Sequence, residues 1–370
     1  MLIVLPLITA LTFYLFIERK ILFLSTGLTL FYILSQSLFF SSEILILSWI
    51  IVLTGIWINN NENSLLGWIF LIGSFLTLTS TSSISLFLSI EILSMTILIL
   101  INLYIQDQYP GILYYLFSGL FSALFLLSLG YLSLGYLSAS KILCIVLFAK
   151  LGLVPFHILL PNIYNNLSPQ VILLMDIPYK MILFFVLYRL NFLFLDYSFW
   201  IALSLIIGAI GSIRYQNLFS VWIYSSLYNY GLILITIHYQ AMDYFLYYIF
   251  IYSLTAMIFF YLVTSKFINR QIENQIYILF WFLLLINLIG IPPFNGFFIK
   301  FQVLYLALYH HSWFFFILVS FGLIFLTYTY LRLLISMMIN SRSYHIQLNT
   351  TKNAHFLSVL MVLSLWPLWF

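Results

Sequence analysis

The chain has 370 residues, of which 64% are hydrophobic and 6% are charged; a soluble domain carries about 25% charged residues to cover its surface, so this composition excludes a protein that folds in water. The formal net charge of +4 comes from scattered residues, which excludes a nucleic-acid-binding patch. A single cysteine, Cys144, and six histidines without paired spacing exclude disulfides and predict no metal site and no bound cofactor in this chain.

Apolar runs of membrane-spanning length follow one another along the chain and predict an all-α polytopic membrane protein with about fourteen transmembrane helices. The runs cover residues 2–17, 21–41, 43–58, 65–82, 84–105, 111–136, 142–161, 169–194, 197–213, 218–238, 241–266, 275–308, 312–338 and 355–370. The polar breaks between them are too short for a water-soluble domain, so we expect a single transmembrane domain over residues 1–370. The first run lacks a cleavage site and is expected to be retained.

Lysine and arginine residues lie mainly after the odd-numbered runs. Basic residues in short loops favour the inside of a membrane, so we expect the odd loops inside and both termini outside. The basic residues after odd-numbered runs are Arg19, Lys20, Arg214, Lys266, Arg270, Arg342 and Lys352, and those after even-numbered runs are Lys141 and Arg189.

Two apolar segments with a shared pattern predict an internal repeat with broken helices. KLGLVPF at Lys150–Phe156 and LIGIPPF at Leu288–Phe294 share Gly, Pro and Phe in register, with an aliphatic residue on each side of the Gly. They fall in the seventh and twelfth runs, which cross the membrane in opposite directions and therefore predict an inverted repeat. Proline removes a backbone donor and glycine eases a bend, so we expect breaks here, either as ordinary kinks or beside a hydrated path. The residues concerned are Gly152, Pro155, Gly290, Pro292, Pro293 and Gly296.

A few charged side chains lie deep inside these runs, where each costs at least ~2.5–3.5 kcal/mol unless it is paired or hydrated. They are Glu91, Lys150, Asp176, Lys180 and Lys300. Asp176 precedes Lys180 by one helical turn, so a local ion pair is the simplest interpretation. The lysines are too far from the ends of their runs to reach the membrane surface. For Glu91 two interpretations stay open: an ion pair that serves packing, and a site that binds and releases a proton.

Two further polar features each have two interpretations. His157 is a candidate proton relay, because histidine titrates near neutral pH, or it bonds to a carbonyl freed by a nearby proline. The segment YSSLYNYG at Tyr224–Gly231 either lines a hydrated path with hydroxyls or uses them for contacts between helices.

Together these motifs resemble the antiporter-like membrane subunits of respiratory complex I. The elements are EILS at Glu91, KLGLVPFH at Lys150, PYK at Lys180, YSSLYNYG at Tyr224 and GIPPFNGFFIK at Lys300. The resemblance covers about residues 85–302. Within this family the chain is most similar to the branch formed by mitochondrial subunit 2 and the bacterial N-chain, because its eighth run reads IPYKMI rather than a histidine-rich pattern.

The resemblance implies a fold of about fourteen helices with two inverted five-helix repeats and broken helices in spans 7 and 12. The implied divisions are three N-terminal spans at 1–64, a first repeat at 65–194, a second repeat at 197–340 and a last span at 354–370. It also implies that Glu91 and Lys150 form a coupled acid–base pair, with Lys180 as central relay. Lys300 would then hand over or release the proton. Asp176 stands where relatives usually have a small or apolar residue, and it is a candidate partner of Lys180.

The implied function is proton translocation as a membrane-arm subunit of NADH:ubiquinone oxidoreductase. The implied location is the mitochondrial inner membrane, with both termini in the intermembrane space. FMN, iron–sulfur clusters and ubiquinone are then expected in other subunits. The expected partners are other membrane-arm subunits, antiporter-like neighbours among them, and lipids such as cardiolipin. The alternatives are a cation/proton antiporter subunit of the multi-subunit type and a non-pumping structural membrane subunit.

Overall fold

The computed structural model describes residues 64–80, 82–104, 108–136, 138–190, 198–215, 217–268, 275–292 and 294–341. Within these ranges the regular secondary structure is entirely helical. The first three predicted spans, the last span, both termini and Pro293 lie outside the described residues. The predicted all-α fold is therefore confirmed for the part of the chain that the structure describes, and the total of about fourteen spans stays a prediction.

The chain divides into two compact units, the first ending at Arg189 and the second including residues 151–165 and everything after 189. The first unit contains α4 (Ser64–Thr79), α5 (Ser83–Tyr104), α6 (Gln108–Ser133), α7 (Ala139–Leu151, as far as Lys150), α9 (Pro169–Asp176) and α10 (Pro178–Arg189). The second unit contains the short 3-10 helix η1 (Phe156–Ile158), α8 (Leu159–Tyr164), α11 (Ser198–Arg214), α12 (Leu218–His238), α13 (Met242–Ile268), α14 (Gln275–Ile289), α15 (Asn295–Tyr309) and α16 (Trp313–Ser341).

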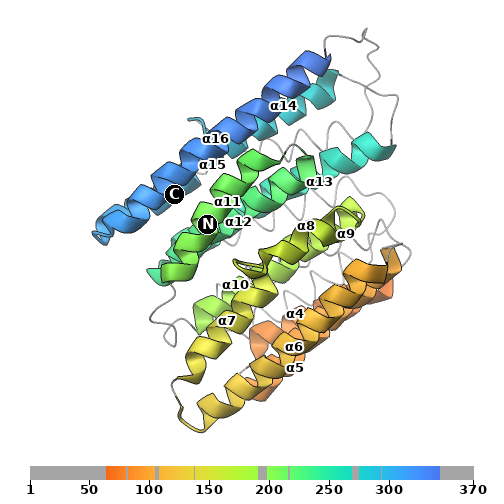
Figure 1. Cartoon of the computed structure of the whole chain (residues 1–370), viewed down its shortest axis with the longest axis vertical. Helices are drawn as coiled ribbons and strands as arrows, with labels where there is room; N and C mark the ends of the chain where they lie inside the picture. Colours follow the sequence, from red (N-terminus) through yellow and green to blue (C-terminus); the bar gives the residue numbers. More distant parts are fainter. Residues whose placement is uncertain are drawn as a thin grey trace, which may run out of the picture. The chain divides into compact units, whose positions relative to one another are not determined.

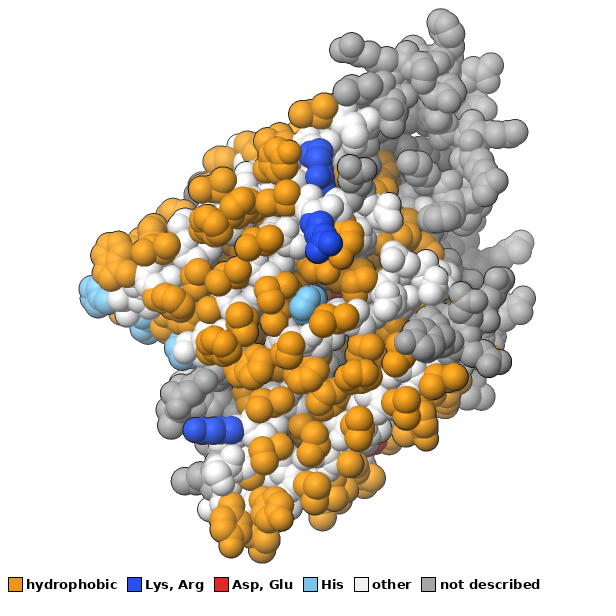
Figure 2. Space-filling model, in the orientation of Figure 1, with side chains coloured by type: hydrophobic (Ala, Val, Ile, Leu, Met, Phe, Trp, Pro, Cys, Tyr) orange, Lys and Arg blue, Asp and Glu red, His pale blue; other side chains and the backbone are white. Residues whose placement is uncertain are grey.

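The predicted runs from the fourth to the thirteenth each correspond to one helix or to a broken pair, with ends that differ by a few residues. Seven helices of the described part are long and apolar enough to cross a membrane. Hydrophobic side chains cover most of the face seen in Figure 2, and few lysines or arginines interrupt them. Such a surface is stable in lipid, where apolar side chains need no cover from water.

Many buried serine and threonine hydroxyls in these helices are satisfied by the backbone of their own helix. Ser89 Oγ donates to the Leu86 carbonyl at 2.9 Å, and Thr96 Oγ1 donates to the Leu93 carbonyl at 2.8 Å. Thr236 Oγ1 does the same toward the Ile233 carbonyl at 2.7 Å in the second unit. Because lipid offers no hydrogen-bond partner, this local bonding lets polar residues stay inside apolar helices without an unsatisfied group.

Within each unit the helices pack side by side. In the first unit α5 packs against both α4 and α6, α9 contacts α5, and α10 contacts α4. Figure 1 shows α4, α5 and α6 running alongside one another. In the second unit α11 packs against α12 and α16, and α12 also contacts α8, α13 and α15. The close approach of α11 to α12 depends on Gly208, since a Cβ atom there would lie 2.6 Å from the backbone nitrogen of Tyr228.

The two predicted broken helices are present. The helix α7 ends at Leu151 and is followed by Gly152 at φ +70°, and α14 ends at Ile289 and is followed by Gly290 at φ +83°. Both glycines take the left-handed conformation that commonly terminates a helix and that residues with a Cβ atom rarely adopt. They occupy the same register in the repeated segment, so the repeat found in the sequence has a matching local structure. The inversion of the second repeat stays a prediction.

A third interruption, which the sequence analysis does not predict, divides the eighth run. The helix α9 ends at Asp176 and α10 begins at Pro178, with Ile177 between them at φ −103° and ψ −78°. Proline lacks the N–H that an unbroken helix would need at this point. The chain continues in nearly the same course, because Met181 N donates to the Ile177 carbonyl at 2.9 Å.

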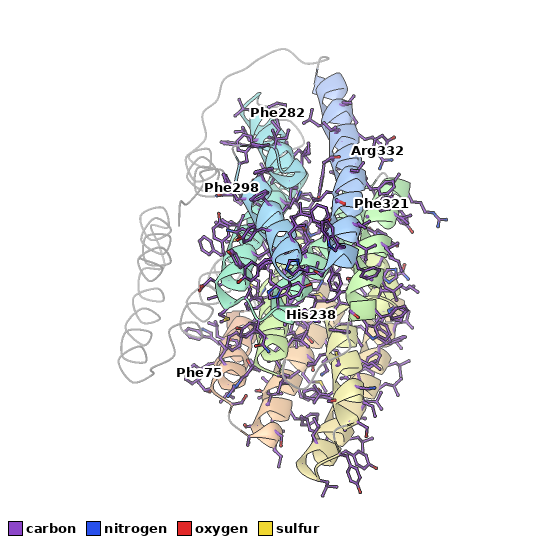
Figure 3. The ribbon with its side chains drawn as sticks, turned by 90° about the vertical axis from the view of Figure 1, so that its left-hand side faces the viewer. Phe75, His238, Phe282, Phe298, Phe321 and Arg332 are labelled. Carbon is purple, nitrogen blue, oxygen red and sulfur yellow. The ribbon has the colours of Figure 1, made fainter. Side chains whose placement is uncertain are left out.

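An arginine from the last helix of each unit bonds to the C-terminal end of that unit's first described long helix. Arg332 on α16 donates to the carbonyls of Ile213, at 2.9 Å, and Tyr215, at the end of α11 (Figure 3). Arg189 on α10 contacts the carbonyl of Leu78 near the end of α4 at 3.5 Å. These carbonyls have no partner within their own helices, and a cation stabilises the negative end of the helix dipole.

Candidate functional site

Glu91 on α5 and Lys150 on α7 form an ion pair in the first unit. Their Oε1 and Nζ atoms are 2.6 Å apart, although the two residues are 59 positions apart in the sequence. The Lys150 side chain is 3% exposed and the Glu91 side chain 17%. The second carboxylate oxygen of Glu91 accepts from Ser94 Oγ at 3.3 Å. A charge-assisted bond of this kind compensates for part of the cost of removing two ions from water.

The position of Lys150 in its helix differs from the expectation. The sequence predicts that Lys150 lies far from the end of its run, but the structure places it in the last turn of α7, because the run breaks at Gly152. An ammonium group is stabilised there by the unpaired carbonyls at the C-terminal end of a helix. The break therefore creates a favourable position for a cation inside a membrane span.

Asp176 and Lys180 form the second ion pair of this unit. Asp176 Oδ1 and Lys180 Nζ are 2.7 Å apart, and both residues are buried. This is the contact that the spacing of one helical turn predicts. The pair crosses the interruption between α9 and α10, since Asp176 is the last residue of α9 and Lys180 the third of α10.

Two tyrosines that belong to none of the predicted site residues lie in the same unit as these ion pairs. The hydroxyl of Tyr114 on α6 is hydrogen-bonded to that of Tyr179 on α10. Tyr179 directly precedes Lys180 in the PYK motif, which is the one signal in the sequence that could have drawn attention to it.

Lys300 on α15 is the buried cation of the second unit, and its partners are backbone carbonyls. Its Nζ atom donates to the carbonyls of Leu288, at 2.5 Å, and Ile289, at 3.1 Å, at the end of α14. Gly290 leaves room for the ammonium, because a Cβ atom there would lie 3.3 Å from Nζ. In the described part of the chain, the ion pairs within 4.0 Å are those of Lys150 and Lys180, and Lys300 has no carboxylate partner.

The broken helix of the second unit is held by a side-chain amide. Asn287 Oδ1 accepts a hydrogen bond of 2.8 Å from the backbone nitrogen of Gly296 in the first turn of α15. Asn295, the first residue of α15, accepts one of 3.2 Å from Tyr247 OH on α13. Pro292 lies exposed in the segment between α14 and α15. These bonds hold the backbone where the break leaves its polar groups without helical partners.

His157 lies in η1, beside the segment YSSLYNYG of α12. Its ring is buried and contacts the Tyr224 ring edge-to-face, with centroids 6.0 Å apart. Its Nδ1 atom is buried and has no hydrogen-bond partner among the described residues. The neighbouring Pro155 is exposed and joined to Val154 by a cis peptide bond.

Other side chains of YSSLYNYG make contacts between helices. Tyr228 OH donates to the Val319 carbonyl on α16 at 2.8 Å. Asn229 Oδ1 accepts from Tyr248 OH on α13 at 3.0 Å. Of the two interpretations that the sequence leaves open, these bonds favour helix-to-helix contacts for Tyr228 and Asn229. The described residues contain no group of three or more His, Cys, Asp or Glu side chains arranged to hold a metal ion.

Comparison with known proteins identifies relatives of this chain. Subunit N of NADH-quinone oxidoreductase from Hydrogenovibrio crunogenus is 30% identical over 179 residues, which are 42% of this chain and 37% of that protein. Subunit N from Campylobacter jejuni is 28% identical over 236 residues, or 57% of this chain and 50% of that protein. The matched region thus spans half or less of the length of these curated relatives.

Solved structures share the fold. A chain of respiratory complex I from Thermus thermophilus has a TM-score of 0.74 at 18% identity, covering 87% of this chain and 82% of its own length. A chain of an archaeal membrane-bound sulfane sulfur reductase has a TM-score of 0.74 at 16% identity, and the match covers 87% of this chain and 77% of that one. A chain of the Mrp complex from Dietzia has a TM-score of 0.67 at 15% identity, and the match covers 84% of this chain and 66% of that one. Because residues 128–327, more than half of the chain, also match the family described as NADH:quinone oxidoreductase/Mrp antiporter, transmembrane, the chain belongs to that family.

Proposed function

We propose that this chain is a proton-translocating membrane-arm subunit of an NADH:quinone oxidoreductase. The observation that carries the proposal is the ion pair between Lys150 Nζ and Glu91 Oε1, which are 2.6 Å apart on two different helices and whose side chains are 3% and 17% exposed. Burial opposes the charged form of each group and the opposite charge favours it, so a small change in their separation changes which group holds the proton. An ion pair that served only packing would not need two further buried lysines.

In this proposal the proton moves along a relay of buried cations. When Glu91 and Lys150 separate, the ammonium of Lys150 loses its stabilising carboxylate and gives up a proton. Lys180, paired with Asp176, is the central relay, and Lys300 in the second unit is the group from which the proton leaves or to which it is handed. His157 is an additional candidate relay. Each lysine binds and releases one proton, so the chain itself needs no redox centre.

The chain would act within an assembly whose other subunits supply the redox chemistry. Flavin, iron–sulfur clusters and quinone are expected there, and the single cysteine of this chain is too few for the thiolate ligands of an iron–sulfur cluster. The proposed partners are further membrane-arm subunits, antiporter-like neighbours and lipids such as cardiolipin. We place the chain in the mitochondrial inner membrane, with both termini toward the intermembrane space. The relatives from bacteria make a bacterial membrane the alternative location.

A second candidate function is that of a cation/proton antiporter subunit. The family that matches residues 128–327 includes Mrp antiporters, and a chain of the Mrp complex from Dietzia shares the fold. This alternative predicts sodium-dependent proton exchange without NADH. The proposed function instead predicts that the chain copurifies with flavin and iron–sulfur subunits, which mass spectrometry of the native complex would detect. A non-pumping structural subunit would copurify with them as well, so pumping has to be measured.

The decisive experiment replaces the relay lysines in the assembled complex. Lys150→Met and Lys180→Met complexes are reconstituted into sealed vesicles, and quinone reduction and proton uptake are measured together. NADH oxidation by ferricyanide, which needs only the flavin-containing part, serves as the control for assembly. We expect proton uptake to fall at least tenfold, the size of effect that loss of a proton-transfer group produces. Unchanged rates with an unchanged proton-to-electron ratio would overturn the proposal.

A further inference from the structure

We propose that Asn287 and Tyr247 are positioning residues for Lys300, because they hold together the two helix ends between which the Lys300 ammonium binds. The inference rests on the proposed function and goes beyond it by assigning a role to two residues outside the relay. Asn287 lies on α14, Tyr247 on α13 and Lys300 on α15, and all three helices belong to the second unit.

The two helix ends at the break supply each other's missing hydrogen bonds. The backbone nitrogen of Gly296, in the first turn of α15, donates to Asn287 Oδ1 at 2.8 Å. In return, Lys300 Nζ donates to the carbonyls of Leu288, at 2.5 Å, and Ile289, at 3.1 Å, at the end of α14. These are the backbone groups that a helix end leaves without partners. A shift of either helix end therefore changes both contacts.

Asn287 supplies a cap that α15 does not receive from its own sequence. Phe294, the residue before α15, makes no side-chain hydrogen bond to the helix, because a phenyl ring lacks an acceptor of the kind that caps helices. Asn287 is only 2% exposed, so its amide takes the place of water at this helix end. The two ends are in direct contact, since a Cβ atom at Gly296 would lie 1.8 Å from the backbone carbonyl oxygen of Asn287.

A second contact holds the first turn of α15 from the side of α13. Tyr247 OH donates to Asn295 Oδ1 at 3.2 Å, and Asn295, which precedes Gly296, is fully buried. The helix α13 is unbroken over its 27 residues and packs against both α14 and α15. Side chains from two neighbouring helices thus hold the first turn of α15.

The position of this turn matters for Lys300, which follows Gly296 by one helical turn. Lys300 is 7% exposed, so the carbonyls at the end of α14 replace water as acceptors for its ammonium. Hydrogen bonds to the charged form of a group favour that form. If the helix ends move apart, Nζ loses acceptors and holds its proton less firmly. Asn287 and Tyr247 would thus control the retention of the proton by Lys300 without binding a proton themselves.

The test removes each contact while keeping a side chain of similar size. Asn287→Leu and Tyr247→Phe complexes are reconstituted into sealed vesicles, and quinone reduction and proton uptake are measured over a series of pH values. Tyr248→Phe is the matched control, because Tyr248 is the next residue of α13 and its hydroxyl makes the same kind of bond. That bond, of 3.0 Å to Asn229 Oδ1 on α12, involves neither end of the break.

The pH profile distinguishes positioning from a structural role. Proton uptake requires a protonated Lys300, so the pH above which uptake falls reports how firmly Lys300 holds its proton. We expect this pH to decrease by about one unit in Asn287→Leu, which corresponds to a tenfold weaker hold on the proton, and by less in Tyr247→Phe. A structural role alone would lower the amount of assembled complex and leave this pH unchanged. The native value in both variants, or an equal decrease in the control, would overturn the inference.

The lysine variants separate this inference from the proposed function. If Lys300→Met stops proton uptake while Asn287→Leu and Tyr247→Phe keep the native pH profile, the function stands and the positioning role is wrong. If Lys300→Met keeps native uptake, as do Lys150→Met and Lys180→Met, the proposed function itself is wrong. If Asn287→Leu does not assemble, Tyr247→Phe carries the test, since it removes only one hydroxyl group.

Discussion

Lys300 Nζ lies 2.5 Å from the carbonyl oxygen of Leu288, the residue that takes the place of Lys150 in the repeated segment. In both units an ammonium group thus lies at the C-terminal end of the first part of a broken helix. In the first unit the lysine belongs to that helix, and in the second it reaches it from α15. The ammonium of Lys300 is held by the carbonyls of that helix end, whereas the ammonium of Lys150 is held by the carboxylate of Glu91.

Lys300 can be tested with two substitutions of different chemistry. Lys300→Met removes the donor and leaves the carbonyls of Leu288 and Ile289 unsatisfied, at about 1–3 kcal/mol for a buried group. Lys300→Arg keeps a cation, but the guanidinium does not release its proton. We expect the arginine complex to be closer to native stability than the methionine complex and yet equally deficient in proton uptake. Thermal dissociation and vesicle assays would measure the two effects, and native pumping by Lys300→Arg would contradict the relay role.

The ion pair of Glu91 and Lys150 predicts that the stability of the complex falls strongly when either partner is removed alone. Glu91→Gln or Lys150→Met alone leaves a buried charge without its partner, which costs about 3–5 kcal/mol. The double substitution removes both charges and should be less destabilising than the sum of the single ones. Thermal stability of the four complexes gives the coupling energy. Additive destabilisation would mean that the pair contributes nothing to stability.

Two of the glycines with positive φ, Gly290 and Gly135, allow backbone strain to be separated from function. Gly290→Ala forces a Cβ atom into the left-handed region at a cost of about 1–2 kcal/mol, and it also crowds Lys300 Nζ. Gly135, after α6, has φ +87° and open space around it, so Gly135→Ala has the strain without the crowding. We expect both substitutions to lower stability, Gly290→Ala the more because of the added crowding, and a loss of proton uptake only from Gly290→Ala. Equal uptake by the two variants would show that the space beside Lys300 is unimportant.

Arg332 predicts an effect on stability alone. Arg332→Met leaves the carbonyls of Ile213 and Tyr215 without their charged donor, and a hydrogen bond to a charged group contributes about 1.5–3 kcal/mol. Arg332→Lys has fewer donors and should be intermediate. Tyr328→Phe, an exposed position one turn earlier on α16, is the control. The midpoint temperature of thermal dissociation should be highest for the native complex, lower for Arg332→Lys and lowest for Arg332→Met. If Arg332→Met were as stable as the control, the capping role would be wrong.

Arg332 also shows what a count of basic residues misses. It lies inside the run 312–338, and the charge asymmetry between loops concerns only basic residues that lie outside the runs. Arg189 is one of the two exceptions to the predicted charge asymmetry, and its contact with the end of α4 offers a structural reason for its position. The carbonyls at a helix end can therefore bind an arginine at a position that the preference of basic residues for inside loops does not predict.

The sequence by itself determined the features that depend on composition and on near neighbours. The lack of charge requires lipid, the apolar runs match the helices, and Gly152 and Gly290 mark the breaks, because helix termination depends on the local backbone. The contact of Asp176 with Lys180 follows from a spacing of one turn.

Only the tertiary structure decided which distant groups meet. The partner of Lys150 is 59 positions away, the partners of Lys300 are backbone carbonyls with no side-chain signature, and Tyr114 finds Tyr179 on another helix. Spacing along one helix says nothing about a residue on the next, since the described helices are apolar on most sides and their neighbours are determined by packing. The few charges were visible in the sequence, but their pairing depends on how the helices assemble.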